Sequence, residues 1–571
     1  MRVDLTIVRR KGVYRLNKSI LLLLISTILF LSACSISANN ENGSATEVIL
    51  PVTKDLPQNQ KVREIVLNVP TKEDDPIQYE YGFMMAEEWK KLGLDVKVEP
   101  LNSSSFSDIH AQKKEFDSLI LTWNHSFNGY DPDSFINRLG ANHGDNLSGY
   151  DHAEYNAMVD EQRKTKNLGD RKEIIKKAEE QLLENVPIAP IVHRNHLLPI
   201  KNEKFTNFTY TTGEGLNSFW TFMELEPKGI QKYVRWGYPS DLETLNPLAS
   251  SRKLDSQVFR LVYDHLVRIS ETGEVKNSAA TSIEDVNEDG KKYLIKLRED
   301  LTFHDGEKVT ATDIKFSFDL VKESKIPAFD SLVEHIEKVE IVDELSVRFT
   351  LKQHFAPFLS ETLSQIYILP HHIWQPIFEE KGGNGVLEDS NEKMIGSGPF
   401  IFDYWDPGQE LKLDTNKNYF SQSKINGILR IPYENEEKLI TDVINGNVEI
   451  SGAEVTPIEV EKLNESNEME VISVPSVDLD AVHFNIREKP FDDHFFRQAL
   501  TLTIPREKII GEILKEHAQV ANGLIAPANE SWHSSDLEGY EYNLEAAVNT
   551  LKDAGYKWNE KGEIYYPGKP K

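Results

Sequence analysis

Hydrophobic and polar positions alternate along the chain with the period of a strand in some segments and of a helix in others. Residues 64–69 and 94–98 alternate as half-buried strands do, and residues 77–92 carry apolar side chains at helical spacing. Asp75-Pro76 favours a helix start, and Gly93 favours a helix end. Strand, helix and strand in this order predict a βαβ unit with parallel strands.

Similar patterns continue toward the C-terminal end. Residues 116–123 predict a buried strand, and residues 253–270 predict an amphipathic helix. The glycines in residues 381–392 predict a loop, and residues 557–571 predict a hairpin. Since strands and helices mix throughout, the sequence predicts the α/β class with additional antiparallel pieces.

The N-terminal segment has the pattern of an export signal. Residues 1–18 are basic, and residues 20–31 are apolar but too short for a comfortable membrane span. Leu31-Ser32-Ala33-Cys34 resembles a bacterial lipobox, in which Cys34 takes the lipid. The alternative is an ordinary signal peptide with a coincidental cysteine. We therefore expect a lipoprotein signal over residues 1–33 and a flexible tether over residues 34–60.

Composition narrows the function classes. The 571 residues include 39% hydrophobic and 27% charged residues, which is typical of globular proteins. The net charge of −28 argues against nucleic acid as a partner, because phosphate binding needs Lys and Arg. The single cysteine excludes an intramolecular disulfide, a CxxC pair and a thiolate zinc cluster. We expect no cofactor.

Motifs of enzymes are missing from the sequence. It contains no GxSxG, HExxH or GxxxxGK[ST], and no GxGxxG after a strand. Because the chain has 92 acidic residues, chance carboxylate pairs occur and counting alone leaves a glycosidase dyad open. No feature selects such a dyad, and we expect a protein that is not an enzyme.

Residues 277–323 closely resemble the signature of the bacterial extracellular solute-binding proteins of family 5, the oligopeptide, dipeptide and nickel receptors of ABC importers. The resemblance is carried by Phe303-His304-Asp305-Gly306 and by the helix start at Thr310-Ala311-Thr312-Asp313. Gly396-Ser397-Gly398-Pro399-Phe400 and Phe495-Phe496-Arg497-Gln498-Ala499-Leu500 agree as well.

The matching pieces stand in an unusual order. Residues 233–247 resemble the mature N-terminus of family members, and residues 543–571 resemble the middle of their third domain. Residues 63–225 resemble the remainder of that domain and the usual C-terminus. Joining Lys571 to Lys61 would therefore restore the usual order of the family's segments. We interpret the chain as a circular permutant. A fragment of a tandem duplication and a decayed or misassembled gene are the alternatives.

The resemblance implies a mixed α/β, two-lobed fold of the periplasmic-binding-protein type (class II, cluster C), with an extra domain and circularly permuted. Two crossover strands are implied near Pro187–Arg194 and Ala481–Arg487. The implied domains are residues 61–195 as the second part of the distal lobe (domain III), 196–275 as part of the first lobe (domain I), 276–394 as the extra domain II, 395–480 as the rest of domain I, and 481–571 as the first part of domain III.

The resemblance also implies a ligand-binding loop that contains Trp123, Asn124, Ser126 and Asp131. Di- and oligopeptide receptors often carry an Asp three residues after this Trp, where it pairs with the α-ammonium of the ligand. Ser126 stands there in this chain, which implies weaker recognition of a free N-terminus. Trp123 either stacks on the ligand or packs in the core. Asp131 either contacts the ligand or caps the following helix.

Further binding candidates lie on other segments. Asn485 and Arg487 lie on an implied crossover, where Arg487 either meets a ligand carboxylate or forms an interlobe ion pair. Arg252 belongs to a segment that borders the cleft by resemblance. His371-His372 resembles a metal pair, but it lies in a stretch that matches the family, which favours a structural role. We expect no metal site.

The expected function is that of a substrate-binding lipoprotein of an ABC importer, which captures peptides between two lobes. The implied partners are a peptide ligand, the permease and ATPase subunits, and the membrane through the lipid at Cys34. We expect a monomer on the outer face of the cytoplasmic membrane or in the periplasm. The alternatives are a non-peptide solute such as a nickel chelate, and a peptide-signal sensor.

Overall fold

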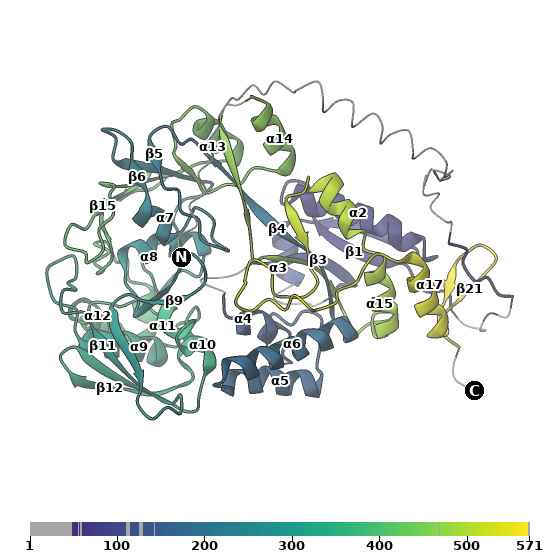
Figure 1. Ribbon diagram of the computed structural model, residues 1–571, viewed down its shortest axis with the longest axis horizontal. Helices are drawn as coiled ribbons and strands as arrows, with labels where there is room; N and C mark the ends of the chain where they lie inside the picture. The colour runs from purple at the N-terminus through teal and green to yellow at the C-terminus, as the bar shows by residue number, and fades with distance from the viewer. Residues whose placement is uncertain are drawn as a thin grey trace, which may run out of the picture. The chain divides into compact units, whose positions relative to one another are not determined.

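The computed structural model describes residues 48–54, 56, 60–109, 115–124, 130–141, 143–466 and 469–568 (Figure 1). The elements below all belong to one compact unit, Leu50–Lys571. The predicted signal segment, Cys34 and most of the predicted tether lie outside the described residues. Across the described ranges, no helix is both long enough and apolar enough for a membrane span.

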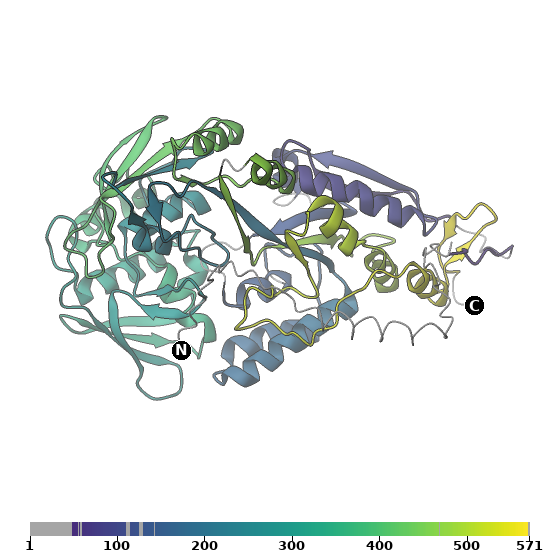
Figure 2. The ribbon, with the colours of Figure 1, turned by 45° about the horizontal axis from the view of Figure 1, so that its top comes forward.

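One half of this unit, which we call the distal lobe, is built on β1 (Ile65–Pro70), α2 (Pro76–Lys90) and β2 (Val96–Leu101). The strands pair in parallel with Ile65 opposite Val96, which confirms the predicted βαβ unit. The Asp75 carboxylate accepts hydrogen bonds from the N–H groups of Ile77 and Gln78 and so caps α2. The helix packs along both strands, as the purple elements of Figure 2 show.

The distal lobe continues with two further groups of elements. The first group is α3 (Ser103–Asp108), β3 (Ser118–Trp123), α4 (Asp133–Ile136), η2 (Asn137–Leu139), α5 (Ala153–Lys164) and α6 (Leu168–Asn185). The second group is β19 (Leu479–Phe484), α15 (His494–Leu502), α16 (Arg506–Lys508), η4 (Ile509–Ile513), β20 (Ala518–Val520), α17 (Leu544–Asp553), β21 (Lys557–Trp558) and β22 (Ile564–Tyr565).

The first lobe takes its elements from two stretches of the chain. The first stretch contains β5 (Phe205–Thr206), α7 (Phe219–Glu224), β6 (Glu226–Pro227), β7 (Tyr233–Tyr238), α8 (Lys253–Val262), β8 (Val267–Ile269) and β9 (Val275–Asn277). The second contains β14 (Phe400–Asp406), β15 (Glu410–Thr415), β16 (Gly427–Pro432), α13 (Glu436–Ile444), β17 (Ile450–Ser451), α14 (Pro457–Ser466) and β18 (Glu470–Pro475).

An extra domain lies between these two stretches in the sequence. Its four-stranded antiparallel sheet has the order β10-β11-β13-β12. Its elements are β10 (Ala280–Asp285), β11 (Lys292–Leu297), α9 (Ala311–Ser324), α10 (Asp330–Val333), β12 (Ile336–Asp343), β13 (Ser346–Leu351), η3 (Ala356–Phe358), α11 (Thr362–Gln365) and α12 (His371–Leu387). Its apolar side chains share one large core cluster with those of the first lobe.

Strand β4 (Ile188–Ile200) connects the two lobes. Its first half pairs with β19 of the distal lobe, and its second half pairs with β18 of the first lobe. The chain crosses a second time between β18 and β19, where Pro475 and Leu479 mark the strand ends. The two lobes are therefore joined by neighbouring crossover strands, the geometry of a hinge.

The predicted helix over residues 253–270 is wrong in its second half. Helix α8 ends at Val262, whose carbonyl accepts a 2.8 Å hydrogen bond from the N–H of Gly398. Gly396 lies so close to this helix end that a Cβ there would meet the Val262 carbonyl oxygen at 2.0 Å. The apolar residues that follow form β8, because a distant segment occupies the space of the next turn.

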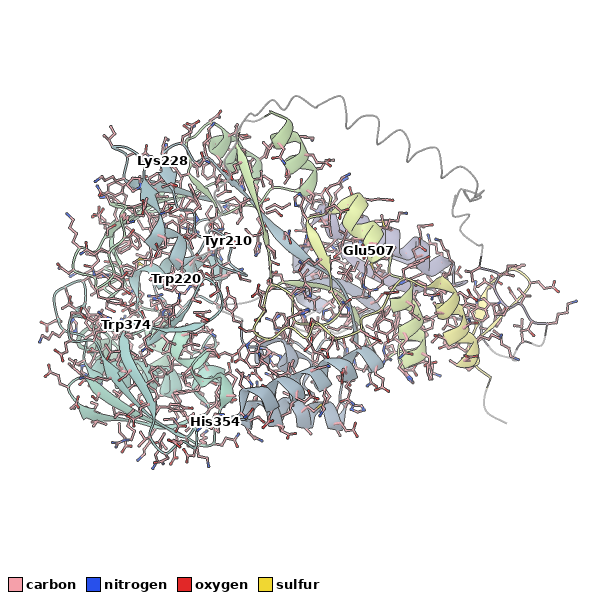
Figure 3. All side chains as sticks on the ribbon, viewed as in Figure 1. Tyr210, Trp220, Lys228, His354, Trp374 and Glu507 are labelled. Atoms are coloured by element: carbon pink, nitrogen blue, oxygen red, sulfur yellow. The ribbon has the colours of Figure 1, made fainter. Side chains whose placement is uncertain are left out.

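The loop predicted over residues 381–392 is also wrong in its first half. Helix α12 runs from His371 to Leu387, with one interruption at Gly382, where φ is +69°. Trp374 is buried in the first turns of this helix (Figure 3). The ring of His371 packs on Phe316, and Nε2 of His372 lies 2.8 Å from a carboxylate oxygen of Asp305.

The C-terminal strands β21 and β22 form the predicted hairpin, and the chain around residue 61 runs beside it. The N–H of Val62 donates to the carbonyl of Ile564 at 2.9 Å, and the N–H of Tyr566 donates to that of Gln60 at 3.2 Å. Lys61 pairs with Glu563 at 2.9 Å. The two segments that a circular permutation would join are therefore neighbours, which is the geometry that the interpretation requires.

Candidate ligand-binding cavity

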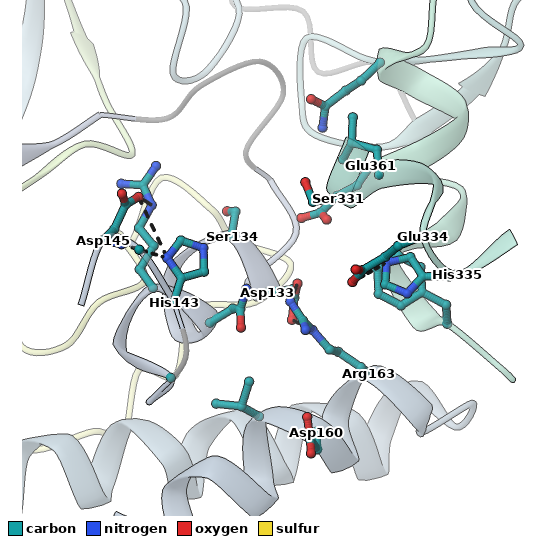
Figure 4. A pocket seen from close by; sticks show the side chains of 18 of the residues that line it. Asp133, Ser134, His143, Asp145, Asp160, Arg163, Ser331, Glu334, His335 and Glu361 are labelled. Atoms are coloured by element: carbon teal, nitrogen blue, oxygen red, sulfur yellow. Dashed lines mark hydrogen bonds and ion pairs between the residues drawn. The ribbon is translucent and has the colours of Figure 1, made fainter. Parts of the chain in front are cut away.

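A cavity of about 830 Å³ lies where the distal lobe faces the extra domain. Asp133 and Arg163 line it from the distal lobe, and His335 and Glu361 line it from the extra domain (Figure 4). Phe355 of the extra domain lines it as well. Its volume falls within the roughly 300–1,000 Å³ of small-molecule sites in proteins.

Two carboxylate–guanidinium pairs lie on the distal side of this cavity, one lining it and one behind its wall. Arg163 on α5 donates from Nε and Nη2 to the two carboxylate oxygens of Asp133, at 2.6 and 2.7 Å. Arg171 on α6 pairs in the same bidentate manner with Asp131. Asp131 also accepts the N–H of Asp133 at 3.0 Å, which holds both carboxylates in place around Pro132. Bidentate pairs of this kind are geometrically specific and strong.

Hydrogen bonds and an ion pair join the distal lobe to the extra domain and to the first lobe. Ser360 donates its hydroxyl hydrogen to Oδ2 of Asp131 at 3.0 Å, and Lys166 lies 2.8 Å from Oδ2 of Asp285. The hydroxyl of Tyr130 donates to the carbonyl of Thr212 in the first lobe. The distal lobe is therefore in direct contact with both the extra domain and the first lobe.

Glu361 lines the cavity from the extra domain. Burial and the neighbouring carboxylates of Asp133 and Asp131 raise its pKa well above the usual value for Glu. Arg163 and Arg171 act in the opposite direction. Desolvation is thus the main cause of the raised pKa of Glu361, and the paired charges of the distal lobe act on it in both directions.

A second, smaller cavity of about 280 Å³ lies beside the crossover strands. Arg194 on β4 reaches Asp480 and Asp75 at 3.0 Å each. His196 lies 2.6 Å from Glu454, and this contact, opposed by desolvation, leaves the pKa of Glu454 lowered to about 2. These charges are satisfied within the protein, which makes the larger cavity the better candidate for a ligand.

Of the described residues of the predicted binding loop, Asn124 lines one of these two cavities, whereas Trp123 and Asp131 do not. Trp123 is 3% exposed and packs edge-on against His483, with the Arg138 guanidinium 5.7 Å from its ring centre. Its side chain therefore belongs to the core of the distal lobe. Asn124 lines the smaller cavity, and its carbonyl accepts from Arg138 at 3.1 Å. Ser126 lies outside the described residues. Asp131 is buried in the pair with Arg171 behind the cavity wall.

The other predicted site residues lie elsewhere. Asn485 and Arg487 line a separate depression of about 730 Å³ beside β1 and β2. Asn485 donates to the carbonyl of Phe116, and Arg487 donates to that of Leu147, each at 2.8 Å. Arg252 lies near the first lobe's Glu243 at 3.1 Å and is not among the residues that line the described cavities. The structure does not bring these three together with Trp123.

Sequence reasoning missed the residues that line the large cavity. Asp133 carries a visible signal, because it follows Asp131-Pro132 at the start of a helix. Arg163 and Glu361 carry none, since nothing in the local sequence distinguishes them from other charged residues on helices and turns. Among the described residues, no group of three or more His, Cys, Asp and Glu side chains has the arrangement of a metal site.

The chain is similar in sequence to a known protein family and to individual binding proteins. Residues 274–571 match the family described as bacterial extracellular solute-binding proteins, family 5 (middle). The chain is 28% identical over 324 residues to the oligopeptide-binding protein AppA of Bacillus subtilis, which covers 55% of the chain and 57% of AppA. It is 26% identical over 327 residues to the glutathione-binding protein GsiB of Salmonella paratyphi A, which covers 56% of the chain and 60% of GsiB.

The matched part thus spans somewhat over half the length of these relatives. Among solved structures, the ABC transporter substrate-binding protein CtaP of Listeria monocytogenes is 23% identical and has a TM-score of 0.50, with 58% of this chain and 66% of that chain covered. At this identity the likeness concerns the fold, which is the two-lobed fold described above. The family match covers more than half of the chain, and the chain belongs to the bacterial extracellular solute-binding proteins of family 5.

Proposed function

We propose that the chain is the substrate-binding protein of an ABC importer and that it captures peptides. The observation that carries this proposal is the cavity of about 830 Å³ between the distal lobe and the extra domain, in a chain whose distal and first lobes are joined by the neighbouring crossover strands of β4 and β18–β19. Hinge motion about such strands closes the lobes on a ligand and converts binding into a shape that a transporter senses.

Peptides are favoured over other solutes by the relatives, two of which are named for oligopeptides and for glutathione. The cavity wall supplies both charged pairs and apolar surface, from Asp133–Arg163 and Phe355. Such a mixture suits a ligand with polar backbone groups and varied side chains. In this proposal the chain performs no catalysis.

The proposal also includes the partners, the membrane anchor and the domain boundaries of such a substrate-binding protein. The ligand-loaded protein delivers its peptide to permease and ATPase subunits. A lipid at Cys34 holds it as a monomer at the outer face of the membrane, and residues 34–60 act as the tether. The domain boundaries near residues 195, 275, 394 and 480 belong to this proposal as well.

Thermal unfolding of the full chain with pools of synthetic peptides tests this function. A ligand that binds only the folded state raises the unfolding midpoint in a saturable manner. The variant Ser331→Trp fills the cavity, because the exposed Ser331 lines it. Ser282→Trp is the matched control, since Ser282 is also exposed in the extra domain but lies outside the residues that line the cavity.

We expect wild type and Ser282→Trp to be stabilised by peptide and Ser331→Trp to lose the effect. A cooperatively folded wild-type chain that no peptide pool of any length stabilises would contradict the proposal.

A further inference from the structure

A very small cavity lies where the first lobe meets the extra domain. Thr211, Glu214, Arg260 and His265 are among the residues that line it from the first lobe, and Ser364 on α11 lines it from the extra domain. The cavity offers about 10 Å³ to the centre of a water-sized sphere. A polar cavity of this size has room for about one water molecule.

His265 is a buried side chain without a hydrogen bond. It is 1% exposed, and neither Nδ1 nor Nε2 has a hydrogen-bond partner among the described residues. Its ring packs against that of Tyr367, with 5.0 Å between the ring centres. Burial, together with the charges of Arg268 and Arg260, lowers the pKa of His265 well below its usual value, and the imidazole is therefore neutral.

A neutral imidazole has one N–H donor and one bare nitrogen that accepts, and leaving these groups unpaired in a protein interior costs free energy. Buried polar groups of native proteins have a partner with few exceptions, and that partner is either protein or ordered water. Because the described part of the chain supplies none for His265, an additional molecule is the remaining source of a hydrogen bond.

The charged groups around His265 favour a neutral occupant of the cavity. Arg260 pairs with Glu214 at 2.6 Å, and Arg268 pairs with Asp264 at 3.0 Å. An anion in the cavity would lie beside the carboxylate of Glu214, and a cation would lie beside the guanidinium group of Arg260. Burying either kind of ion without a free counter-charge is costly.

The two hydroxyl groups of the lining have already donated their hydrogens. Thr211 donates to Oγ of Ser218 at 2.9 Å, and Ser364 donates to the carbonyl of Ser360. Both hydroxyl oxygens can therefore only accept a further hydrogen bond, as can the bare nitrogen of His265. A lining of this kind fits a small neutral molecule that donates two hydrogens, which is water.

We propose that one buried water molecule occupies this cavity and joins the first lobe to the extra domain. It hydrogen-bonds a ring nitrogen of His265 and the hydroxyl oxygens of Thr211 and Ser364. The residue after Thr211 accepts the hydroxyl of Tyr130 at its carbonyl, so that the water lies next to the turn that receives the distal lobe. The water site goes beyond the proposed function and does not depend on the identity of the ligand.

A crystal structure of the full chain, at a resolution that shows ordered waters, tests the proposal directly. We expect one density peak in the cavity, about 2.7–3.2 Å from a ring nitrogen of His265 and from the hydroxyl oxygen of Thr211 or Ser364. A cavity without density overturns the proposal, and so does a peak whose anomalous signal identifies it as chloride or a metal ion.

The variant His265→Phe provides a second measurement, because it keeps a ring and removes both nitrogens. His371→Phe is the matched control, since the ring of His371 packs on Phe316 and lies outside the residues that line the cavity. Oxygen-17 magnetic relaxation dispersion counts the long-lived buried waters of each protein in solution. We expect one fewer in His265→Phe than in wild type and no change in His371→Phe.

Equal counts of long-lived water in wild type and His265→Phe overturn the proposal. The crystal structure of the wild-type chain decides the question by itself if His265→Phe does not fold.

Discussion

The hydroxyl group of Ser360 donates a 3.0 Å hydrogen bond to Oδ2 of Asp131, and this bond joins the extra domain to the distal lobe. The same carboxylate neutralises Arg171, whose side chain is only 5% exposed. Asp131 therefore has two roles, one in the stability of the distal lobe and one in the contact between the lobes. Substitutions on either side separate these roles.

The substitution Asp131→Asn leaves the buried guanidinium of Arg171 without its counter-charge. Removing one partner of a buried pair costs about 3–5 kcal/mol, and we expect a clearly lower unfolding midpoint in urea. Ser360→Ala is the matched control, because it removes the interlobe bond and keeps the buried pair. It should cost about 1–2 kcal/mol at most and weaken ligand affinity instead. Equal unfolding midpoints for the two variants would contradict this assignment.

The ring of Tyr130 in the distal lobe packs closely against Gly273 in the β8–β9 turn. The φ of Gly273 is +89°, and a Cβ there would meet the ring of Tyr130 at 2.8 Å. We expect Gly273→Ala to push the lobes apart and to weaken peptide binding, as measured by calorimetry. Gly306→Ala is the control for backbone strain, since φ is +96° there and no atom lies within 4 Å of the added Cβ. Equal losses of affinity in both variants would assign the effect to strain rather than to Tyr130.

The buried carboxyl group of Glu179 on α6 makes stability depend on pH. Its Oε1 accepts the N–H groups of Leu524 and Ile525, yet burial raises its pKa from 4.5 to about 7. The folded state binds the proton of Glu179 more tightly than the unfolded state does. The loss of unfolding free energy that ionised Glu179 causes is therefore absent below pH 4.5. It grows as pH rises to 7 and reaches roughly 3 kcal/mol above that.

Urea unfolding at pH 5 and pH 8 measures this contribution through the variant Glu179→Gln, which has no proton to lose. Wild type should lose more stability between the two pH values than the variant does. Identical pH dependence in both proteins would show that Glu179 does not titrate differently in the folded state.

The neighbouring positions of Lys61 and Tyr565 allow a test of the circular-permutation interpretation. A rearranged chain would start at Glu226, run through Lys571 directly into Lys61 and end at Leu225. Since the joined segments already lie side by side, we expect it to fold with the same circular dichroism spectrum and a similar unfolding midpoint. A rearranged chain that does not fold cooperatively would contradict the interpretation.

The sequence predicted the local parts of the fold well. Asp75-Pro76, the helix that follows and the two flanking strands formed the predicted βαβ unit, because capping and periodicity are local signals. The end of α8 at Val262 was not predictable in this way. It depends on Gly396 and Gly398, which approach the helix end from a segment more than a hundred residues away. A short apolar run after a helix has no periodicity that would separate strand from helix.

The residues of the candidate site were also not predictable from local sequence signals. The resemblance pointed to the loop around Trp123, whose side chain the structure places in the core. Glu361 and Arg163 line the same cavity only because the extra domain faces the distal lobe, and they are far apart in the sequence. A cavity built from such distant segments leaves no linear motif.

Native mass spectrometry of the purified full chain, followed by denaturation and identification of the released molecules, tests the central claim most directly. The account predicts a compact monomer that carries masses in the peptide range and releases peptides on denaturation. A compact monomer that releases a non-peptide solute, or that stays empty after incubation with pools of synthetic peptides, would contradict it.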